Sequence, residues 1–216
     1  MSRPRTGATT PRAEPPATAM VLALAAVVIL HPACARGELL HFKVDPSASE
    51  ISAMVLEPMS SLRGNVTGKF RVVSGELSSD AASPARTTSV KLVIDPASYW
   101  SGWSMRDRTV TGSILQAETY PQIVFKGGDV DNIVHTGDAS GTATIRGTLT
   151  LHGVARAIIV PVAVRLTSGT RVETDGEVSL GYPDWGISVP TTLFGLMRAG
   201  DQATIRFHIV AITGSS

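Results

Sequence analysis

His152 is the first candidate for chemistry in this sequence, because it stands within the stretch GTLTLHGVARAIIVPVAVRL, residues 147–166. A catalytic histidine needs a nucleophile or a carboxylate within hydrogen-bond reach, and the flanking Thr150 and Arg156 do not indicate such a pair. We therefore expect His152 to order a hairpin turn, and we expect no catalytic residue, no metal and no cofactor. The other histidines are isolated, with no pair at metal-ligand spacing: His31, His41, His135 and His208.

Apolar and polar residues alternate through most of the sequence after residue 36. This period predicts β-strands, because successive side chains of a strand point to opposite faces. Turn signals separate the strands, among them Asp45-Pro46, Asp95-Pro96 and Gly127-Gly128-Asp129. Since helices do not alternate with the strands, we expect an antiparallel barrel or sandwich. The alternating runs are residues 50–57, 64–77, 88–95, 121–127, 142–151 and 203–212.

One segment departs from this period. In residues 104–119, SMRDRTVTGSILQAET, the residues Met105, Val110 and Ile114 recur near helical spacing. Ser104 is the expected N-cap, since its hydroxyl accepts a hydrogen bond from a backbone N–H of the first turn. The sequence therefore predicts one short helix, which we expect in a loop near the mouth of the barrel.

Composition excludes one class of partner. The chain has 216 residues, a formal net charge of +1 and only 17% charged residues. A nearly neutral chain without basic runs lacks the electrostatic footprint of a nucleic-acid-binding protein. We expect no nucleic-acid partner.

The N-terminus predicts a signal peptide over residues 1–35. Arginines at positions 3, 5 and 12 precede an apolar run over residues 17–30 and an Ala-Cys-Ala site. The run of about 14 residues is short for a transmembrane helix, which needs about 20. We expect cleavage after Ala35, a periplasmic or secreted protein without a stable membrane span, and a single domain over residues 36–216.

Cys34 is the one cysteine of the chain. A lipoprotein signal places a small or aliphatic residue three positions before the cysteine, where this sequence has His31. We expect Cys34 to be removed with the signal peptide rather than lipidated, which leaves the mature chain without a disulfide.

Several blocks of the sequence resemble one family. GTLTLHGVARAIIVPV resembles the G-x-L-T-hydrophobic-H-G-V signature of the YceI-like family of secreted polyisoprenoid-binding proteins. The further blocks follow in the family's order from about Phe42 to Ile212, and they are FKVDPSASEISAMV, GNVTGKFRVVSGEL, SMRDRTVTGSILQAETYPQIVF, DWGISVP and RAGDQATIRFHIVAI.

The resemblance implies an all-β, lipocalin-like barrel of eight antiparallel strands that holds a long isoprenoid chain. The sequence also departs from the family. Many members carry a histidine in the strand after the opening Asp-Pro-Ser and another shortly after the Arg-Asp pair, whereas AMVLEPMS and RDRTVTGSIL contain none. The family's head-group contact is therefore not carried over to these positions. Arg106 is a candidate to contact a phosphate head group, but an internal pair with Asp107 or a place on the helix surface is the favoured interpretation.

The residues expected to line the ligand lie on the inward faces of the strands and in the loops at the mouth. Small inward residues, among them Ala143 and Gly147, are expected to leave room for the ligand. The expected lining residues are Val55, Phe70, Val72, Leu92, Ile94, Trp100, Trp103, Met105, Ile123, Phe125, Ala143, Ile145, Gly147, Leu149, Val160, Val162, Trp185, Phe194, Ile205 and Phe207.

Three functions fit these expectations. The first is an exported protein that carries or stores an isoprenoid or another long-chain apolar lipid of the polyprenyl or quinone type. The second is a structural or stress-protective periplasmic barrel with a filled core. The third, a lipid-modifying enzyme, is disfavoured because the inward positions supply no acid, base or nucleophile. The sequence fits a monomer or a homodimer.

Overall fold

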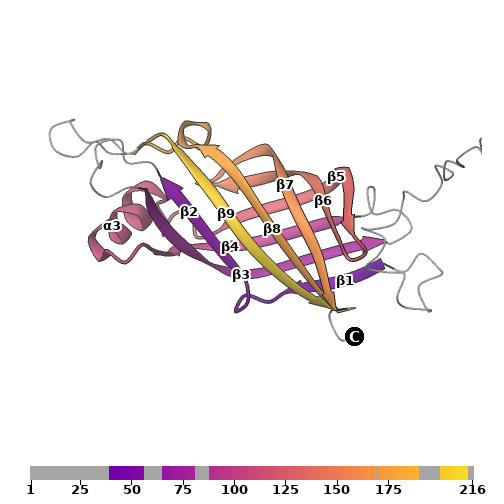
Figure 1. Cartoon of the computed structure of the whole chain (residues 1–216). Coiled ribbons are helices and arrows are strands. Elements are labelled where there is room, and N and C mark those ends of the chain that lie inside the picture. Colours follow the sequence, from indigo (N-terminus) through magenta and orange to yellow (C-terminus); the bar gives the residue numbers. More distant parts are fainter. Residues whose placement is uncertain (1–38, 56–64, 81–87, 169, 190–199, 214–216) are drawn as a thin grey trace, which may run out of the picture.

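The computed structural model describes residues 39–55, 65–80, 88–168, 170–189 and 200–213, and in them the chain forms a sheet of 9 strands (Figure 1). The strands are β1 (Leu39–Val44), β2 (Glu50–Val55), β3 (Val66–Asp80), β4 (Ser89–Trp100), β5 (Ile123–Gly137), β6 (Ser140–Leu151), β7 (Val154–Ser168), β8 (Arg171–Gly181) and β9 (Gln202–Thr213). All of the pairings are antiparallel.

The sheet closes into a barrel. Its order runs β3-β2-β9-β8-β7-β6-β5-β4, and β4 pairs with β3 again. β1 and β2 both lie between β3 and β9, each on a different part of those two strands. The prediction of an antiparallel eight-stranded barrel is thus confirmed. One of the eight strand positions, the one between β3 and β9, is shared by the two short strands β1 and β2.

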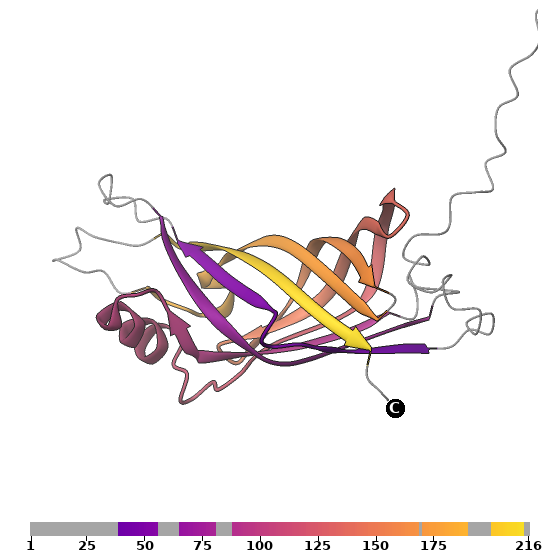
Figure 2. The same ribbon diagram turned by 60° about the horizontal axis from the view of Figure 1, so that its bottom comes forward.

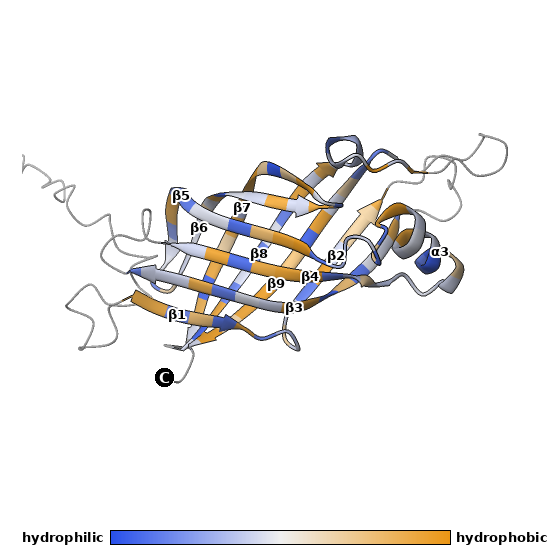
Figure 3. Ribbon diagram, turned by 180° about the vertical axis from the view of Figure 1, so that it is seen from behind, coloured by the Kyte–Doolittle hydropathy of each residue, from blue (hydrophilic) through white to orange (hydrophobic). Residues whose placement is uncertain are grey.

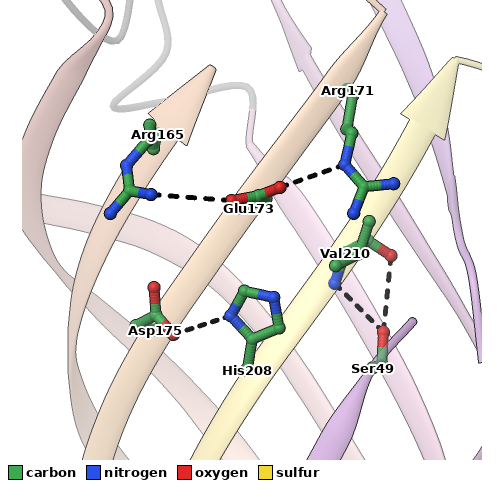
Figure 4. A network of polar contacts seen from close by, with 7 residues as sticks. All are labelled: Ser49, Arg165, Arg171, Glu173, Asp175, His208 and Val210. Atoms are coloured by element: carbon green, nitrogen blue, oxygen red, sulfur yellow. Dashed lines mark hydrogen bonds and ion pairs between the residues drawn. The ribbon is translucent and has the colours of Figure 1, made fainter. Parts of the chain in front are cut away.

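A turn at Asp45 separates β1 from β2. The Asp45 carboxylate accepts hydrogen bonds from the Ser47 backbone N–H at 2.9 Å and from the Ser47 hydroxyl at 2.6 Å. The Ser47 hydroxyl is the main reason that the pKa of Asp45 lies below its ordinary value. Ser49 then returns the chain to the barrel, since its hydroxyl accepts the Val210 N–H of β9 at 3.0 Å (Figure 4).

Polar pairs tie the outer faces of neighbouring strands in the same region. Glu173 of β8 receives Arg171 at 3.0 Å and Arg165 of β7 at 3.7 Å, while Asp175 of β8 meets His208 of β9 at 2.7 Å (Figure 4). Pairs like that of Asp175 and His208, whose side chains are 50% and 39% exposed, contribute little stability each. Their positions across adjacent strands favour the observed register.

Two of the predicted turns are wrong, because the strands continue through them. β4 passes through Asp95-Pro96, and β5 passes through Gly127-Gly128-Asp129. Both places carry a register shift, and in β4 residues 96–99 lie opposite Phe70 alone. Such bulges accommodate proline and glycine inside a strand without ending it.

The predicted helix is present as α3 (Ser104–Arg108), which continues into the π-helical η1 (Thr109–Ile114). Ser104 is not the N-cap: Trp103 occupies that position, without a side-chain hydrogen bond. The Thr111 hydroxyl donates to the backbone oxygen of Asp107 at 2.9 Å, a bond that locally disturbs regular helix. No helix in the described parts of the chain is long and apolar enough to span a bilayer.

α3 lies at the end of the barrel where β2 ends (Figures 1 and 2). The register places the ends of β4, β6 and β8 at this same end. We call it the helix end and the opposite end, where β1 begins, the far end. The remaining helix, the 3-10 segment η2 (Tyr182–Trp185), follows β8 at the helix end.

Candidate ligand-binding cavity

A cavity of about 980 Å³ occupies the interior of the barrel. Its lining reaches from Leu40 of β1 near the far end to Trp103 and Met105 beside α3 at the helix end. This volume lies at the upper end of the roughly 300–1,000 Å³ of ligand pockets. An engineered apolar cavity of only about 150 Å³ already stays dry and takes up benzene. The interior is therefore large enough for an extended apolar molecule.

The wall of the cavity is apolar because the strands alternate. Along most of the strands, alternate residues border the cavity. Bands of apolar and polar residues succeed one another along the ribbons (Figure 3). Among the described residues, the lining contains no histidine, cysteine or aspartate, and its charged members are Glu76, Lys91 and Arg106. Such a wall can exclude water from an apolar chain. Glu76 and Lys91 lie opposite each other on β3 and β4.

Most of the residues expected to line a ligand border this cavity. Phe194 lies outside the described residues, and Val72, Trp100 and Gly147 do not border the cavity. The expected residues that do are Val55, Phe70, Leu92, Ile94, Trp103, Met105, Ile123, Phe125, Ala143, Ile145, Leu149, Val160, Val162, Trp185, Ile205 and Phe207, together with Arg106.

The three residues away from the cavity have different surroundings. Val72 is 1% exposed and packs with Ile51 and Ile94 in the wall itself. Trp100 is 61% exposed and faces solvent. A Cβ at Gly147 would come within 2.5 Å of the Lys126 carbonyl oxygen, with the Phe125 ring almost as close.

Small inward residues therefore play two roles: some widen the cavity, as the sequence predicts, and others make room for a neighbouring ring. Ala53, Ala143 and Ala203 border the cavity and widen it. The glycines do the opposite: Gly68 makes room for the ring of Tyr99, and Gly147 makes room for that of Phe125. The expectation that Gly147 leaves space for a ligand is wrong, because the ring of Phe125 fills that space.

Polar groups gather where the cavity reaches the helix end. Tyr99, Arg106, Thr109 and Tyr182 all border it there. Burial raises the pKa of Tyr182 to about 12, and the neighbouring Tyr99 adds to the rise. The phenol, like any tyrosine at neutral pH, has a hydrogen to donate, and its raised pKa reflects its burial. Tyr99 and Tyr182 are not among the residues that the sequence predicts to line the ligand; the phenol on an aromatic ring is the missed signal, since a buried tyrosine normally finds a polar partner.

Arg106 is held beside the opening by its neighbours. Its guanidinium carbon lies 5.0 Å from the centre of the Trp103 ring, within the range of a cation–π contact. The adjacent Asp107 accepts hydrogen bonds from Ser101, at 2.9 Å from the backbone N–H and 2.6 Å from the hydroxyl. The guanidinium is thus positioned at the boundary between solvent and cavity.

His152 lies at the corner of the β6–β7 hairpin. Its φ is 51° and that of Gly153 is 75°, as a type I′ turn requires at both central residues. The His152 ring packs on Tyr120, with centroids 4.4 Å apart, and its Nδ1 lies 3.3 Å from the Trp185 carbonyl oxygen. These contacts join the hairpin to η2, and His152 is not among the residues that border the cavity.

Several known proteins resemble this chain. A UPF0312 protein of Pseudomonas fluorescens is 29% identical over 131 residues, which cover 56% of this chain and 64% of that protein. A UPF0312 protein of Pseudomonas putida is 28% identical, over 58% of this chain and 65% of that protein. The chain thus matches less than two thirds of the length of these curated relatives.

Solved structures agree with the barrel. The BcnA protein of Burkholderia cenocepacia matches with a TM-score of 0.63 and 27% identity, over 77% of this chain and 98% of BcnA. A polyisoprenoid binding domain from Saccharophagus degradans matches with a TM-score of 0.62 over 82% of this chain and all of that domain, but at 16% identity it supports the fold alone. The family model of the YceI-like domain matches residues 42–211. The chain belongs to the YceI-like domain family.

Proposed function

We propose that this protein is an exported lipid-binding protein that holds one long isoprenoid chain, of the polyprenyl or quinone type, for carriage or storage. The observation that carries the proposal is the apolar cavity of about 980 Å³ along the inside of the barrel. The similarity in fold to a domain described as polyisoprenoid-binding supports it.

The affinity of such a site comes from the chain rather than from the head group. Each CH₂ transferred from water into an apolar wall contributes roughly 0.8 kcal/mol. Several isoprene units supply enough apolar surface to exceed the cost of ordering the chain. Branched methyl groups fit a wall of Val, Ile and Leu, and the alanines at 53, 143 and 203 widen the channel where it would otherwise narrow.

The head group of the lipid lies at the helix end in this proposal. Tyr182 donates a hydrogen bond from its protonated phenol, with Tyr99 beside it. Arg106 supplies a fixed positive charge at the opening, suited to a phosphate.

The alternative of a structural barrel with a filled core receives less support, because a filled core leaves no cavity of this size. A lipid-modifying enzyme also receives less support, because the charged groups of the described lining are few and Glu76 lies opposite Lys91, while most of the wall is apolar.

Export is part of the proposal. The residues around Ala33, Cys34 and Ala35 favour cleavage after Ala35, which gives a single periplasmic or secreted domain over residues 36–216. N-terminal sequencing of the exported protein tests this step. A chain that begins at Arg36 supports it, and a diacylated Cys34 contradicts it.

The binding proposal is tested by native mass spectrometry of protein purified from the exporting cells, followed by extraction and identification of the lipid. A stoichiometric isoprenoid in the parent protein, absent from the Ala143→Phe variant with a filled cavity, supports the proposal. A folded parent protein that carries no lipid and takes up none from mixed micelles overturns it and favours the structural alternative.

A further inference from the structure

Five residues close together in the sequence at the helix end form what we call the rim patch: Trp100, Trp103, Met105 and Arg108, which are exposed, and Arg106, which is half-buried. Its three apolar members are 61%, 50% and 59% exposed in that order. All three lie within positions 100–105, where β4 passes into α3. The other large apolar side chains exposed in the described parts of the chain are spread over separate strands: Leu39, Val73, Val134, Ile159 and Ile212.

The patch meets the cavity at its opening. Trp103 and Met105 are at least half exposed and also border the cavity. A side chain that touches both solvent and the interior marks the place where the two connect. Anything that covers the rim patch therefore covers the entrance for a ligand.

Two cations accompany the apolar side chains. Arg106 lies over the Trp103 ring, and Arg108 is exposed in the last turn of α3. The carboxylate between them, Asp107, turns back to the Ser101 backbone N–H and hydroxyl. Tryptophan and arginine on one surface are typical of segments that settle at the headgroup level of a bilayer, where indole rings anchor and cations meet anionic lipids.

We propose that the rim patch docks this protein on an anionic lipid bilayer, with the cavity opening against the membrane. The inference rests on the proposed function, since docking lets an apolar chain pass between bilayer and barrel without crossing water. A bilayer fits this surface better than a protein partner does, because a stable protein interface covers about 800 Å² on each side, much more than three apolar side chains offer.

The intrinsic fluorescence of the protein reports on docking directly. The chain has 3 tryptophans. Two are in the rim patch, and the third, Trp185, is 3% exposed inside the barrel. With vesicles of phosphatidylcholine and phosphatidylglycerol we expect a blue shift and quenching by brominated lipid, both reduced by salt and by omission of phosphatidylglycerol.

Matched variants locate the contact. Trp100→Ser should weaken vesicle binding about tenfold without removing bound lipid, because Trp100 does not border the cavity. Ile159→Ser, at a position 53% exposed on β7, is the apolar control and should bind as the parent does.

Arg108→Gln should weaken binding to anionic vesicles about fivefold, whereas Lys126→Gln on β5 should not. All variants are purified after export, and N-terminal sequencing checks that they share the same N-terminus.

The outcomes separate docking from lipid binding. Docking is overturned if the parent protein carries lipid but its tryptophan emission does not change with anionic vesicles. It is also overturned if Trp100→Ser binds vesicles as well as the parent does. Both outcomes leave the proposed function intact. A parent protein that docks but carries no lipid supports the rim patch as a membrane surface and overturns the carrier. Equal losses in Trp100→Ser and Ile159→Ser contradict a localised patch.

Discussion

Gly68 of β3 lies against the ring of Tyr99 of β4, so closely that a Cβ at position 68 would overlap the phenol. The ring also tilts against Phe70, with centroids 5.2 Å apart. Because Gly68 has no side chain, the Tyr99 ring can occupy this position at the helix end of the cavity. Tyr99 in turn contributes to the polar surroundings of Tyr182.

Gly68→Ala should therefore destabilise the barrel. The new methyl group must displace the Tyr99 ring or shift the backbone, and overpacking of this kind costs about 1–3 kcal/mol. Thermal unfolding of the ligand-free protein measures the effect. Gly112→Ala is the matched control, because a Cβ at Gly112 meets no atom within 4 Å. Equal melting temperatures for the two variants would contradict the contact.

Two substitutions on the inner face of β6 should behave differently. Ala143 borders the cavity, so the ring of Ala143→Phe enters open space; we expect near-parent stability together with loss of bound lipid. Gly147 faces the Phe125 ring and the Lys126 carbonyl oxygen, so Gly147→Leu should lower the free energy of unfolding by about 1–3 kcal/mol or more.

Melting curves and lipid extraction of both variants test this contrast. Thr148→Phe places the same ring on the exposed face of β6 and should retain both stability and lipid. A large loss of stability in Ala143→Phe would show that the space beside Ala143 is already filled.

Local sequence was enough to predict which face of each strand turns inward. The alternation that marked Ala143, Ile145 and Leu149 is a property of neighbouring residues, and all three border the cavity. It could not predict which inward positions would be open. Whether Gly68 widens the interior depends on Tyr99, and the bulge at residues 96–99 that brings Tyr99 there forms only when β4 pairs with β3.

Long-range pairing also explains why β1 and β2 share one strand position in the barrel. The sequence marked Asp45-Pro46 as a turn, and the structure has a turn there. That both strands beside this turn would pair with β3 and β9 depends on segments far away in the chain, including the Val210 backbone that holds Ser49. A turn signal says where a strand ends and not where the next one pairs.

His152→Asn should preserve lipid binding at a modest cost in stability. Asparagine tolerates the positive φ of this corner, but it loses the packing of the imidazole on Tyr120 and its contact with the Trp185 carbonyl oxygen. We expect a decrease of about 1 kcal/mol in the free energy of unfolding. His152→Val should cost more, since a β-branched residue resists this backbone conformation. Unchanged stability combined with lost lipid would instead assign His152 a part in binding.

The protein should lose stability in alkaline solution through Tyr182. Burial raises the pKa of its phenol from 10.0 to about 12, so that the folded state keeps a proton which the unfolded state releases near pH 10.0. Where the folded state binds more protons, the free energy of unfolding falls as the pH rises. The contribution of Tyr182 is therefore complete below pH 10.0 and is lost as the pH approaches about 12.

Tyr182→Phe removes this titration while keeping the ring. Denaturant unfolding at a series of pH values should show that the free energy of unfolding declines less steeply with pH in the variant than in the parent. Phenolate absorbance should show that the variant has one fewer tyrosine with a raised pKa. Because Tyr182 borders the cavity, a bound lipid should delay its ionisation further in the parent protein. If parent and variant declined in parallel through this range, the raised pKa of Tyr182 would be contradicted.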